Sequence, residues 1–289
     1  MKTPFFTGVC TALVTPFLDG KINYPMLKVL LQRQMDAGVS AVVLAGTTGE
    51  SPTLSDDEKL ELFRISKEFV EDRLKVIAGT GSNNTKHAMD LSIAAQECGA
   101  DGLLVVSPYY NKATPQGLVA HYCAIAQSVN IPVIAYNVPS RTGVDMPVSV
   151  YQQLAQVPNI AGVKEASTDI GKILRIRSQC PDDFSIWSGN DNLTVPILSL
   201  GGKGVISVIS NLFPEQMSLM TYAALDGDFD TAAALQCRML EWTDFLGCEV
   251  NPIPIKAAMA KFGYDCGVGR LPLTPLSPAN QKILNELTE

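Results

Sequence analysis

Short apolar runs recur along the chain, and each is followed by a segment with the spacing of an amphipathic helix. Continuous apolar strands that alternate with helices predict a parallel sheet covered by helices on both faces. The expected strands are 8–15, 41–46, 75–81, 102–107, 132–137, 160–166, 184–189 and 204–210. The expected helices lie near 24–37, 55–71, 84–98, 115–128, 147–155, 170–179, 191–199 and 214–225.

This repeating pattern predicts an α/β protein whose strands close into a (β/α)8 barrel, the TIM barrel, because the strand–helix units number eight. An open doubly wound sheet is the alternative. Such sheets often carry a Gly-x-Gly-x-x-Gly turn for a dinucleotide, and the nearest approach here, Gly79-Thr-Gly-Ser82, lacks the third glycine. Both observations favour the closed barrel.

The last part of the chain predicts three further helices, interrupted by proline-rich stretches. Their expected ranges are 228–246, 254–262 and 278–288. We therefore expect two parts: residues 1–225 form the barrel with the active site, and residues 226–289 form a C-terminal helical appendage. No chemistry is evident in the appendage.

The composition is that of a soluble globular protein, with 46% hydrophobic and 18% charged residues among 289. The formal net charge is -7 and no basic stripe occurs, so we expect no nucleic-acid partner. The first residues faintly resemble a signal peptide, but Pro4 and Pro16 argue against one, and no apolar run is long enough to span a membrane. Seven cysteines without close pairs suggest reduced thiols, and we expect a cytoplasmic protein.

Histidine is scarce, since His87 and His121 are the only two. No HExxH motif or Cys/His cluster occurs, so we expect neither a zinc site nor a bound cofactor. A magnesium site made only of carboxylates stays open. Acid–base chemistry is therefore expected from tyrosine, threonine, lysine or a carboxylate.

Lys164 lies inside the otherwise apolar run 160–166, which is typical of a buried strand. Burial disfavours the charged form of a lysine, and a neutral amine can form a Schiff base with a carbonyl substrate. The structural alternative is a strand-end lysine that reaches water or pairs with Glu165, and the segment alone favours this alternative. Lysines such as Lys59 and Lys172 are expected on exposed helix faces.

Barrel enzymes build their sites at the carboxyl ends of the strands, and hydroxyl groups gather at two of these ends. Thr47 and Thr48 follow the second strand within Gly46-Thr-Thr-Gly-Glu50, where they could hold a carboxylate or simply cap a turn. Tyr109 and Tyr110 follow the fourth strand, where packing at a subunit contact is the alternative.

The fifth strand ends with Tyr136 and, five residues later, Arg141. An arginine can bind a carboxylate with two parallel hydrogen bonds, and a tyrosine in a dry pocket can relay a proton. Glycine and small residues at the ends of the last two strands leave room for a ligand. An amine, a proton relay and a carboxylate clamp are what a Schiff-base aldolase or lyase needs.

Four motifs together resemble the class I aldolase superfamily that includes dihydrodipicolinate synthase and N-acetylneuraminate lyase. They are Gly46-Thr-Thr-Gly-Glu50, Tyr136-Asn-Val-Pro-Ser-Arg141, Val163-Lys-Glu-Ala166 and Gly204-Val-Ile-Ser207. The resemblance covers nearly the whole chain and is closest to the dihydrodipicolinate synthase branch. It implies a metal-independent lyase that condenses pyruvate with L-aspartate 4-semialdehyde in the diaminopimelate route of lysine biosynthesis.

The resemblance also implies a role for each residue of the site. Lys164 would form the Schiff base with pyruvate, and Tyr136 would be the general acid–base, linked through Thr47 to Tyr110. In this family that last tyrosine enters the site of the neighbouring subunit, and the protein is usually a homotetramer made of two tight dimers.

Three further groups would bind the substrates. Thr48 would hold the pyruvate carboxylate, Gly189 and the backbone of Ile206 would line the pocket, and Arg141 would bind the carboxylate of the semialdehyde.

Two other functions compete with this interpretation. A pyruvate-dependent aldolase acting on a sugar acid, such as N-acetylneuraminate, or on a 4-hydroxy-2-oxo acid would keep Lys164 and Tyr136 but leave Arg141 without its partner. Sialic-acid lyases also often carry Ser-Thr in place of Thr47-Thr48. Asn190 replaces an aspartate of many synthases, a mild departure. A catalytically idle barrel that binds a small oxo acid is the third interpretation, and the intact set of side chains argues against it.

Regulation by L-lysine is expected to be weak or absent. Lysine-inhibited members of the family carry histidines at the positions of Asp56 and Lys59 and a glutamate at that of His87. A lysine at position 59 would repel an incoming ammonium group. The matching residues of a regulatory site are Ser51, Asn83 and Tyr109.

Overall fold

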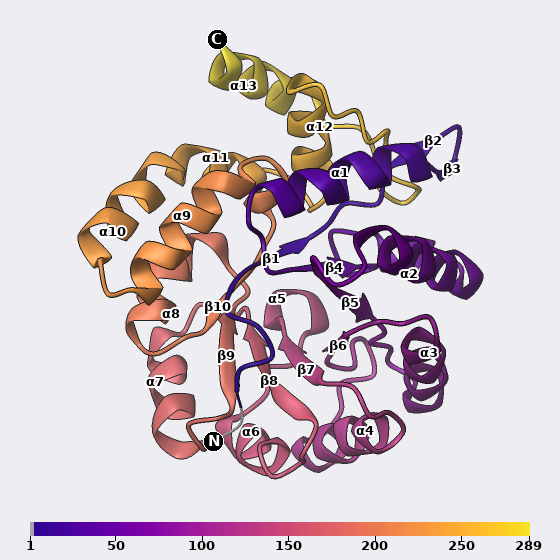
Figure 1. Cartoon of the computed structure of the whole chain (residues 1–289), viewed down its shortest axis with the longest axis vertical. Coiled ribbons are helices and arrows are strands. Elements are labelled where there is room, and N and C mark those ends of the chain that lie inside the picture. The colour runs from indigo at the N-terminus through magenta and orange to yellow at the C-terminus, as the bar shows by residue number, and fades with distance from the viewer. Residues whose placement is uncertain (1–2) are drawn as a thin grey trace.

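The computed structural model describes residues 3–289, and eight parallel strands close into a barrel in the order β1-β10-β9-β8-β7-β6-β5-β4 (Figure 1). The predicted TIM barrel is confirmed. Closure is completed by β1, which pairs with β10 on one side and β4 on the other. The strands are β1 (Gly8–Ala12), β4 (Ala41–Leu44), β5 (Lys75–Gly79), β6 (Gly102–Val106), β7 (Val133–Asn137), β8 (Ile160–Glu165), β9 (Ser185–Ser188) and β10 (Gly204–Ser207).

A helix follows each strand and covers the outside of the barrel, as the apolar spacing predicted (Figure 1). The covering helices are α1 (Tyr24–Asp36), α2 (Asp56–Val70), α3 (Thr85–Glu97), α4 (Pro115–Gln127), α6 (Val148–Leu154), α7 (Ile170–Gln179), α8 (Thr194–Ser199) and α9 (Pro214–Leu225). Their ends carry the expected signals: Ser55 and Glu58, for example, form a reciprocal capping box at the start of α2.

Some short elements were not anticipated from the sequence. They are the hairpin β2 (Phe17–Leu18) and β3 (Lys21–Ile22), the helix α5 (Pro139–Thr142) and the 3-10 turns η1 (Ser51–Thr53), η2 (Asp191–Leu193) and η3 (Ile209–Asn211). For α5 the signals were present, because Pro139 occupies its first turn and Gly143 ends it with a φ of 71°.

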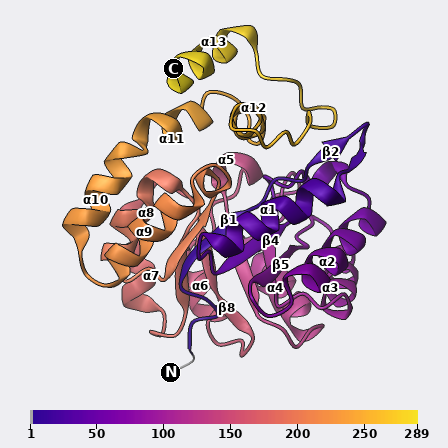
Figure 2. The ribbon, with the colours of Figure 1, turned by 45° about the horizontal axis from the view of Figure 1, so that its top comes forward.

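The C-terminal region consists of α10 (Phe229–Arg238), α11 (Leu240–Leu246), α12 (Ile253–Lys261) and α13 (Pro278–Thr288). The single helix predicted over 228–246 is therefore wrong: a turn at Met239 divides it, and neither glycine nor proline marks the break. These helices form an arc along one side of the barrel (Figure 2). The division of the chain at residue 225 stays a prediction. No helix within residues 3–289 is long and apolar enough to span a membrane.

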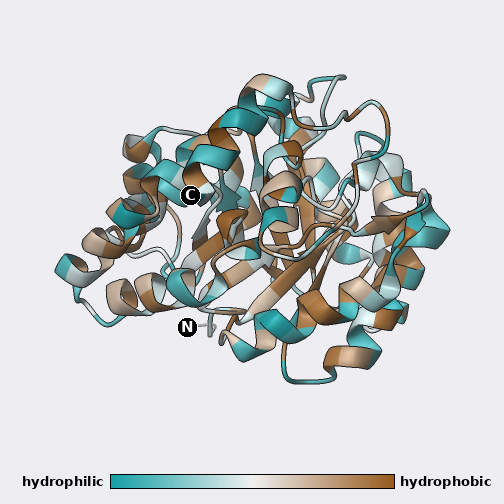
Figure 3. Ribbon diagram, turned by 90° about the horizontal axis from the view of Figure 1, so that it is seen from above, coloured by the Kyte–Doolittle hydropathy of each residue, from teal (hydrophilic) through white to brown (hydrophobic). Residues whose placement is uncertain are grey.

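The barrel separates two apolar cores. The larger core lies between the strands and the covering helices, and the smaller one fills the barrel interior. In Figure 3 the strands are mostly brown, whereas the helices carry teal on parts of their surfaces. Inside the barrel, Trp187 stacks on Phe6 with ring centroids 4.8 Å apart and donates its indole N–H to the Phe6 carbonyl. The interior is thus a packed core below the carboxyl ends of the strands.

A bulge in β8 decides which of its side chains face the interior. Val133 pairs with Ile160 but Ile134 pairs with Gly162, so β8 contains one extra residue at Ala161. Ile160 and Val163 both pack toward the helices, which strict alternation would forbid. Lys164 consequently faces inward and lies directly beside Tyr136 in the ladder.

Gly162 is required by this bulge, and we predict that Gly162→Ala destabilises the protein far more than Gly20→Ala. A Cβ at position 162 would lie 1.9 Å from the Ser185 carbonyl oxygen, inside the barrel wall. At Gly20 a Cβ meets no atom within 4 Å, so only the positive φ of 77° opposes alanine. We expect a loss in the free energy of unfolding of about 1 to 2 kcal/mol for Gly20→Ala and of about 3 kcal/mol or more for Gly162→Ala.

Urea unfolding of both variants measures the difference. Equal losses would contradict the steric role assigned to the bulge.

Candidate active site

A cavity of about 220 Å³ opens at the carboxyl ends of the barrel strands. Its floor includes side chains of the barrel interior, and its walls come from the loops that follow the strands. The lining residues are Ala12, Val43, Gly46, Thr47, Thr48, Leu104, Tyr136, Val138, Ser140, Arg141, Lys164, Ala166, Gly189, Asn190, Val208 and Asn251. Six of the residues predicted for the site therefore share one cavity: Lys164, Tyr136, Thr47, Thr48, Arg141 and Gly189.

Lys164 lies in β8 and is 5% exposed, with its amine near the phenol ring of Tyr136. The Lys164 Nζ atom lies 4.4 Å from the centroid of that ring. Within the described residues, Lys164 forms no ion pair, because Glu165 points to the opposite face of the strand. The structural alternative of a pair between Lys164 and Glu165 is therefore wrong.

Two other buried lysines show what a structural role looks like. Lys172 Nζ lies 3.6 Å from a carboxylate oxygen of Glu165, and Lys256 Nζ lies 2.6 Å from Glu50 Oε1. Both carboxylates are fully buried, so each cation has a compensating charge. Lys164 differs from them because its amine faces a cavity without a carboxylate partner in residues 3–289.

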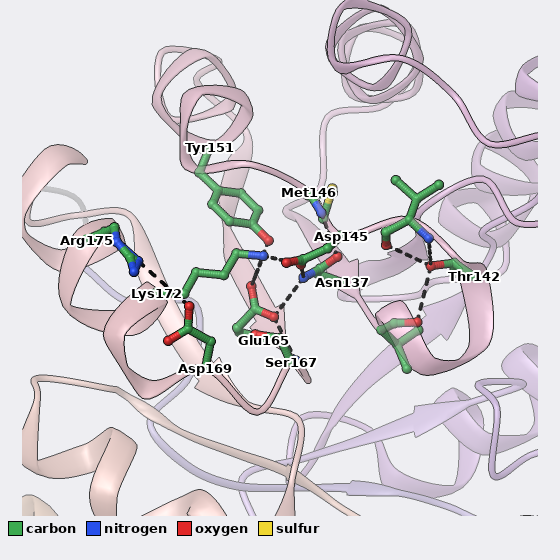
Figure 4. Close-up of polar contacts among 12 residues, drawn as sticks. Asn137, Thr142, Asp145, Met146, Tyr151, Glu165, Ser167, Asp169, Lys172 and Arg175 are labelled. Carbon is green, nitrogen blue, oxygen red and sulfur yellow. Dashed lines mark hydrogen bonds and ion pairs between the residues drawn. The ribbon is translucent and has the colours of Figure 1, made fainter.

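The expectation that Lys59 and Lys172 are exposed is wrong. Lys172 on α7 reaches back over the barrel wall to the β8 carboxylate (Figure 4), and Lys59 on α2 pairs with Asp56 at 3.2 Å. Helical spacing alone placed both on polar faces, but a long side chain can extend from such a position into a buried polar group.

Thr47 and Thr48 occupy the loop after β4, and both line the cavity. Asn251, which connects α11 and α12, donates a hydrogen bond of 3.0 Å from Nδ2 to Thr48 Oγ1. In the described residues the hydroxyl groups of Thr47 and Tyr136 are not hydrogen-bonded to each other. The inferred relay through Thr47 stays a prediction.

Asn251 is a polar site residue that the sequence analysis missed. It lies in the C-terminal region, where no chemistry was expected, in one of the proline-rich stretches that were interpreted as breaks between helices. A polar residue next to two prolines in a rigid loop was the available signal.

Arg141 lies on α5, directly after β7, and forms part of the cavity wall. Its guanidinium forms no ion pair with the described residues. Gly189, after β9, permits close approach of that loop, because a Cβ there would lie 2.6 Å from the Ala166 side chain. The cavity thus combines an amine, a phenol, hydroxyls and a guanidinium.

Asp191 stabilises the loops after β9 and β10 from behind the cavity. Its Oδ2 atom accepts hydrogen bonds of 3.0 Å from the backbone N–H groups of Val208 and Ile209. Burial raises the pKa of Asp191, although hydrogen bonds and the charge of Lys164 oppose this shift.

Two predicted residues lie away from this cavity within the chain. Ile206 is fully buried in the core of the barrel interior, and Val208, two residues later, lines the cavity instead. Tyr110 is 91% exposed, with a left-handed φ of 69°. The roles that the resemblance assigned to Ile206 and Tyr110 therefore stay predictions.

The loop that carries Thr47 and Thr48 is tied to the C-terminal region by Glu50. This residue adopts a left-handed φ of 59°. Its carboxylate forms an ion pair with Lys256 Nζ and accepts a hydrogen bond of 2.9 Å from the backbone N–H of Arg270. Burial lowers the pKa of Lys256, although Glu50 acts in the opposite sense. Helices far along the chain therefore help to shape the cavity.

The residues assigned to regulation by L-lysine form their own polar contacts. Asp56 bonds His87 Nε2 at 2.7 Å and Lys59 Nζ at 3.2 Å. Asn83 accepts a hydrogen bond from Asn111 through its backbone carbonyl. Ser51 begins the 3-10 turn η1, and Tyr109 is partly exposed.

In residues 3–289, no group of three or more His, Cys, Asp or Glu side chains is arranged to hold a metal ion.

Comparisons with known proteins agree with this geometry. The model of the dihydrodipicolinate synthetase family matches residues 5–289. A 4-hydroxy-tetrahydrodipicolinate synthase from Methanosarcina mazei is 49% identical over 285 residues, which cover 98% of this chain and 97% of the relative.

Solved structures are equally similar. The dihydrodipicolinate synthase from Aquifex aeolicus superposes with a TM-score of 0.96 at 42% identity and covers 98% of this chain and 97% of its own. The chloride-inhibited dihydrodipicolinate synthase from Acinetobacter baumannii, complexed with pyruvate, superposes with a TM-score of 0.95 at 38% identity and covers 97% of both chains. The resemblance found in the motifs is confirmed: the chain belongs to the dihydrodipicolinate synthetase family.

Proposed function

We propose that the protein is a 4-hydroxy-tetrahydrodipicolinate synthase, which condenses pyruvate with L-aspartate 4-semialdehyde in the diaminopimelate route of lysine biosynthesis. The relatives with this name match over nearly the full length of both chains. The alternative, an aldolase for sugar acids or 4-hydroxy-2-oxo acids, is disfavoured because the names of these relatives describe the synthase.

The observation that carries the proposed mechanism is the position of Lys164. Its amine is buried, faces the cavity, lies beside Tyr136 and has no carboxylate partner in the described residues. An amine placed in this way can reach a carbonyl carbon in the cavity and form a Schiff base with it.

In the proposed reaction, Lys164 Nζ attacks the carbonyl carbon of pyruvate, and loss of water gives a Schiff base. Tyr136 lies close enough to exchange protons during these steps, and Thr47 lies on the same wall. The Thr48 hydroxyl, held by Asn251, is a donor for the pyruvate carboxylate. Loss of a proton from the methyl carbon of the bound pyruvate then gives the enamine nucleophile.

The second substrate is proposed to bind at the outer part of the cavity. The enamine carbon attacks the aldehyde carbon of the semialdehyde, forming the new carbon–carbon bond, while Arg141 holds the carboxylate. The aldehyde oxygen takes up a proton and becomes a hydroxyl group. The amine of the former semialdehyde then attacks the imine carbon and displaces Lys164 Nζ, which closes the ring and frees the enzyme. Gly189 leaves room for the substrate, and the backbone beside Ile206 supports the wall.

We further propose a cytoplasmic homotetramer made of two tight dimers. Tyr110 supports this assembly, since a tyrosine that is 91% exposed on a left-handed turn is suited to enter a neighbouring subunit. The seven cysteines are all free thiols, in keeping with a reducing compartment.

Borohydride reduction tests the Schiff base. With pyruvate, the wild-type protein is expected to gain one covalent adduct on Lys164, detected by mass spectrometry of its peptides. Lys164→Ala should gain none, whereas Lys172→Met, which removes a different buried amine, should still be trapped if it folds. An adduct on another lysine, or none on the wild type, would refute the mechanism.

Arg141 is expected to affect the binding of the semialdehyde but not that of pyruvate. Arg141→Ala is expected to raise the KM for the semialdehyde by roughly 100-fold or more, because a charged hydrogen-bonded pair with the substrate carboxylate is lost. Trapping of pyruvate should persist. Steady-state kinetics and the trapping rate, measured on one preparation, provide the comparison, and equal loss of both would indicate a structural role.

Inhibition by L-lysine is expected to be weak or absent, because Lys59 is a cation at a position that the resemblance assigns to the regulatory site. The initial rate should stay nearly constant as millimolar L-lysine is added. Lys59→His, which restores the residue of lysine-inhibited relatives, should move the response toward inhibition. Strong inhibition of the wild type would contradict this expectation.

A further inference from the structure

A largely buried polar cluster lies on the helix side of β7 and β8, and Figure 4 shows its contacts. Its central residues are Asn137, Asp145, Glu165 and Lys172. The first three belong to strand ends or the loop between them, and Lys172 comes from α7. The proposed mechanism uses none of these four side chains.

The Glu165 carboxylate has a partner on every side. It accepts hydrogen bonds from the Tyr151 hydroxyl at 2.7 Å, from Asn137 Nδ2 at 2.8 Å and from the Ser167 backbone N–H at 2.8 Å. Lys172 adds a compensating positive charge. A fully satisfied buried network of this kind has one geometry and resists rearrangement.

Asn137 connects this carboxylate to the loop that carries Arg141. Its Nδ2 group donates to Asp145 Oδ1 and Glu165 Oε1, both at 2.8 Å, and its Oδ1 atom accepts from the Met146 backbone N–H at 3.1 Å. Residues 137 and 146 are the two ends of a loop that contains α5. One side chain therefore closes this loop at its base.

A second contact connects the loop 137–146 to the Glu165 carboxylate, through Lys172. Asp145 pairs with Lys172, whose side chain is 6% exposed and also contacts Glu165. Lys172 comes from a helix packed on the barrel, so it is a rigid point of attachment. Asp145 itself is half exposed. Removal of its side chain therefore disturbs the interior less than a change at Asn137.

We propose that Asn137 is a positioning residue that fixes the Arg141 loop against β8 and thereby sets the binding of the second substrate. The inference rests on the proposed function. Asn137 touches no substrate, and its effect passes through the position of the guanidinium. A shift of about 1 Å in such a group can cost roughly 100-fold in rate.

The test uses Asn137→Ala with a matched control. Asn159 donates from Nδ2 to three backbone carbonyls, those of Ala126, Val129 and Ile131, just before β8 at the opposite end of the barrel. Asn159→Ala thus removes a partly buried asparagine that also forms three hydrogen bonds but lies far from the cavity. Asn137→Ala should raise the KM for the semialdehyde by roughly 10-fold or more, whereas Asn159→Ala should leave it near the wild-type value.

Two further measurements distinguish positioning from general damage. The rate of pyruvate trapping on Lys164 should change little in Asn137→Ala, since Lys164 is held by the strand ladder. In the Arg141→Ala background, Asn137→Ala should cause almost no additional rise in the semialdehyde KM, because the group it positions is gone. If Asn137→Ala does not fold, Asp145→Ala takes its place in the test, with a smaller rise in the same KM expected.

Three results would overturn the inference. The first is an equal semialdehyde KM in the Asn137 and Asn159 variants, and the second is a loss of pyruvate trapping in Asn137→Ala as large as its rise in the semialdehyde KM. The third is a rise in this KM that adds fully to that of Arg141→Ala. For the replacement variant, an unchanged semialdehyde KM in Asp145→Ala would do so. The wild type is measured alongside. If it neither traps pyruvate nor turns over the semialdehyde, the proposed function fails, independently of the role of Asn137.

Discussion

The extra residue in β8 is the constraint on which the site depends. With unbroken alternation from Ile160, Lys164 would point toward the covering helices and Glu165 into the barrel. The bulge at Ala161 reverses this arrangement and requires Gly162, because the Ser185 carbonyl leaves no space for a side chain. A backbone irregularity three residues before Lys164 therefore determines where the amine lies.

The same reversal places Glu165 on the face of β8 opposite Lys164. The Glu165 carboxylate therefore lies near Lys172 and away from Lys164, and the two lysines have different surroundings. Lys172 has carboxylates beside it and holds loops together. Lys164, one residue before Glu165, has the ring of Tyr136 as its neighbour instead. Burial alone would not distinguish these lysines, since both are about equally buried. They are distinguished by whether a carboxylate lies beside the amine.

Much of the fold and part of the site could be predicted from the sequence, because both follow from local patterns. The apolar runs gave the order of the strands, and the fold then brought Thr47, Tyr136 and Lys164 to one rim. Asn251 could not be found this way, since its position depends on how the C-terminal helices pack. The buried ion pair of Lys172 was missed for a similar reason: helical spacing indicates a face, but the reach of a long side chain depends on its partner.

The local charge of the cavity differs in sign from the charge of the whole chain. The Arg141 guanidinium lines the cavity without an ion pair in the described residues, and burial raises the pKa of the nearby Asp191. The chain carries a formal net charge of -7, yet charges at the surface are screened beyond about 8 Å at physiological ionic strength. Within a cleft, a nearby cation therefore dominates the potential that a small anion experiences. Each proposed substrate carries a carboxylate, and this local potential would attract that group although the chain as a whole is acidic.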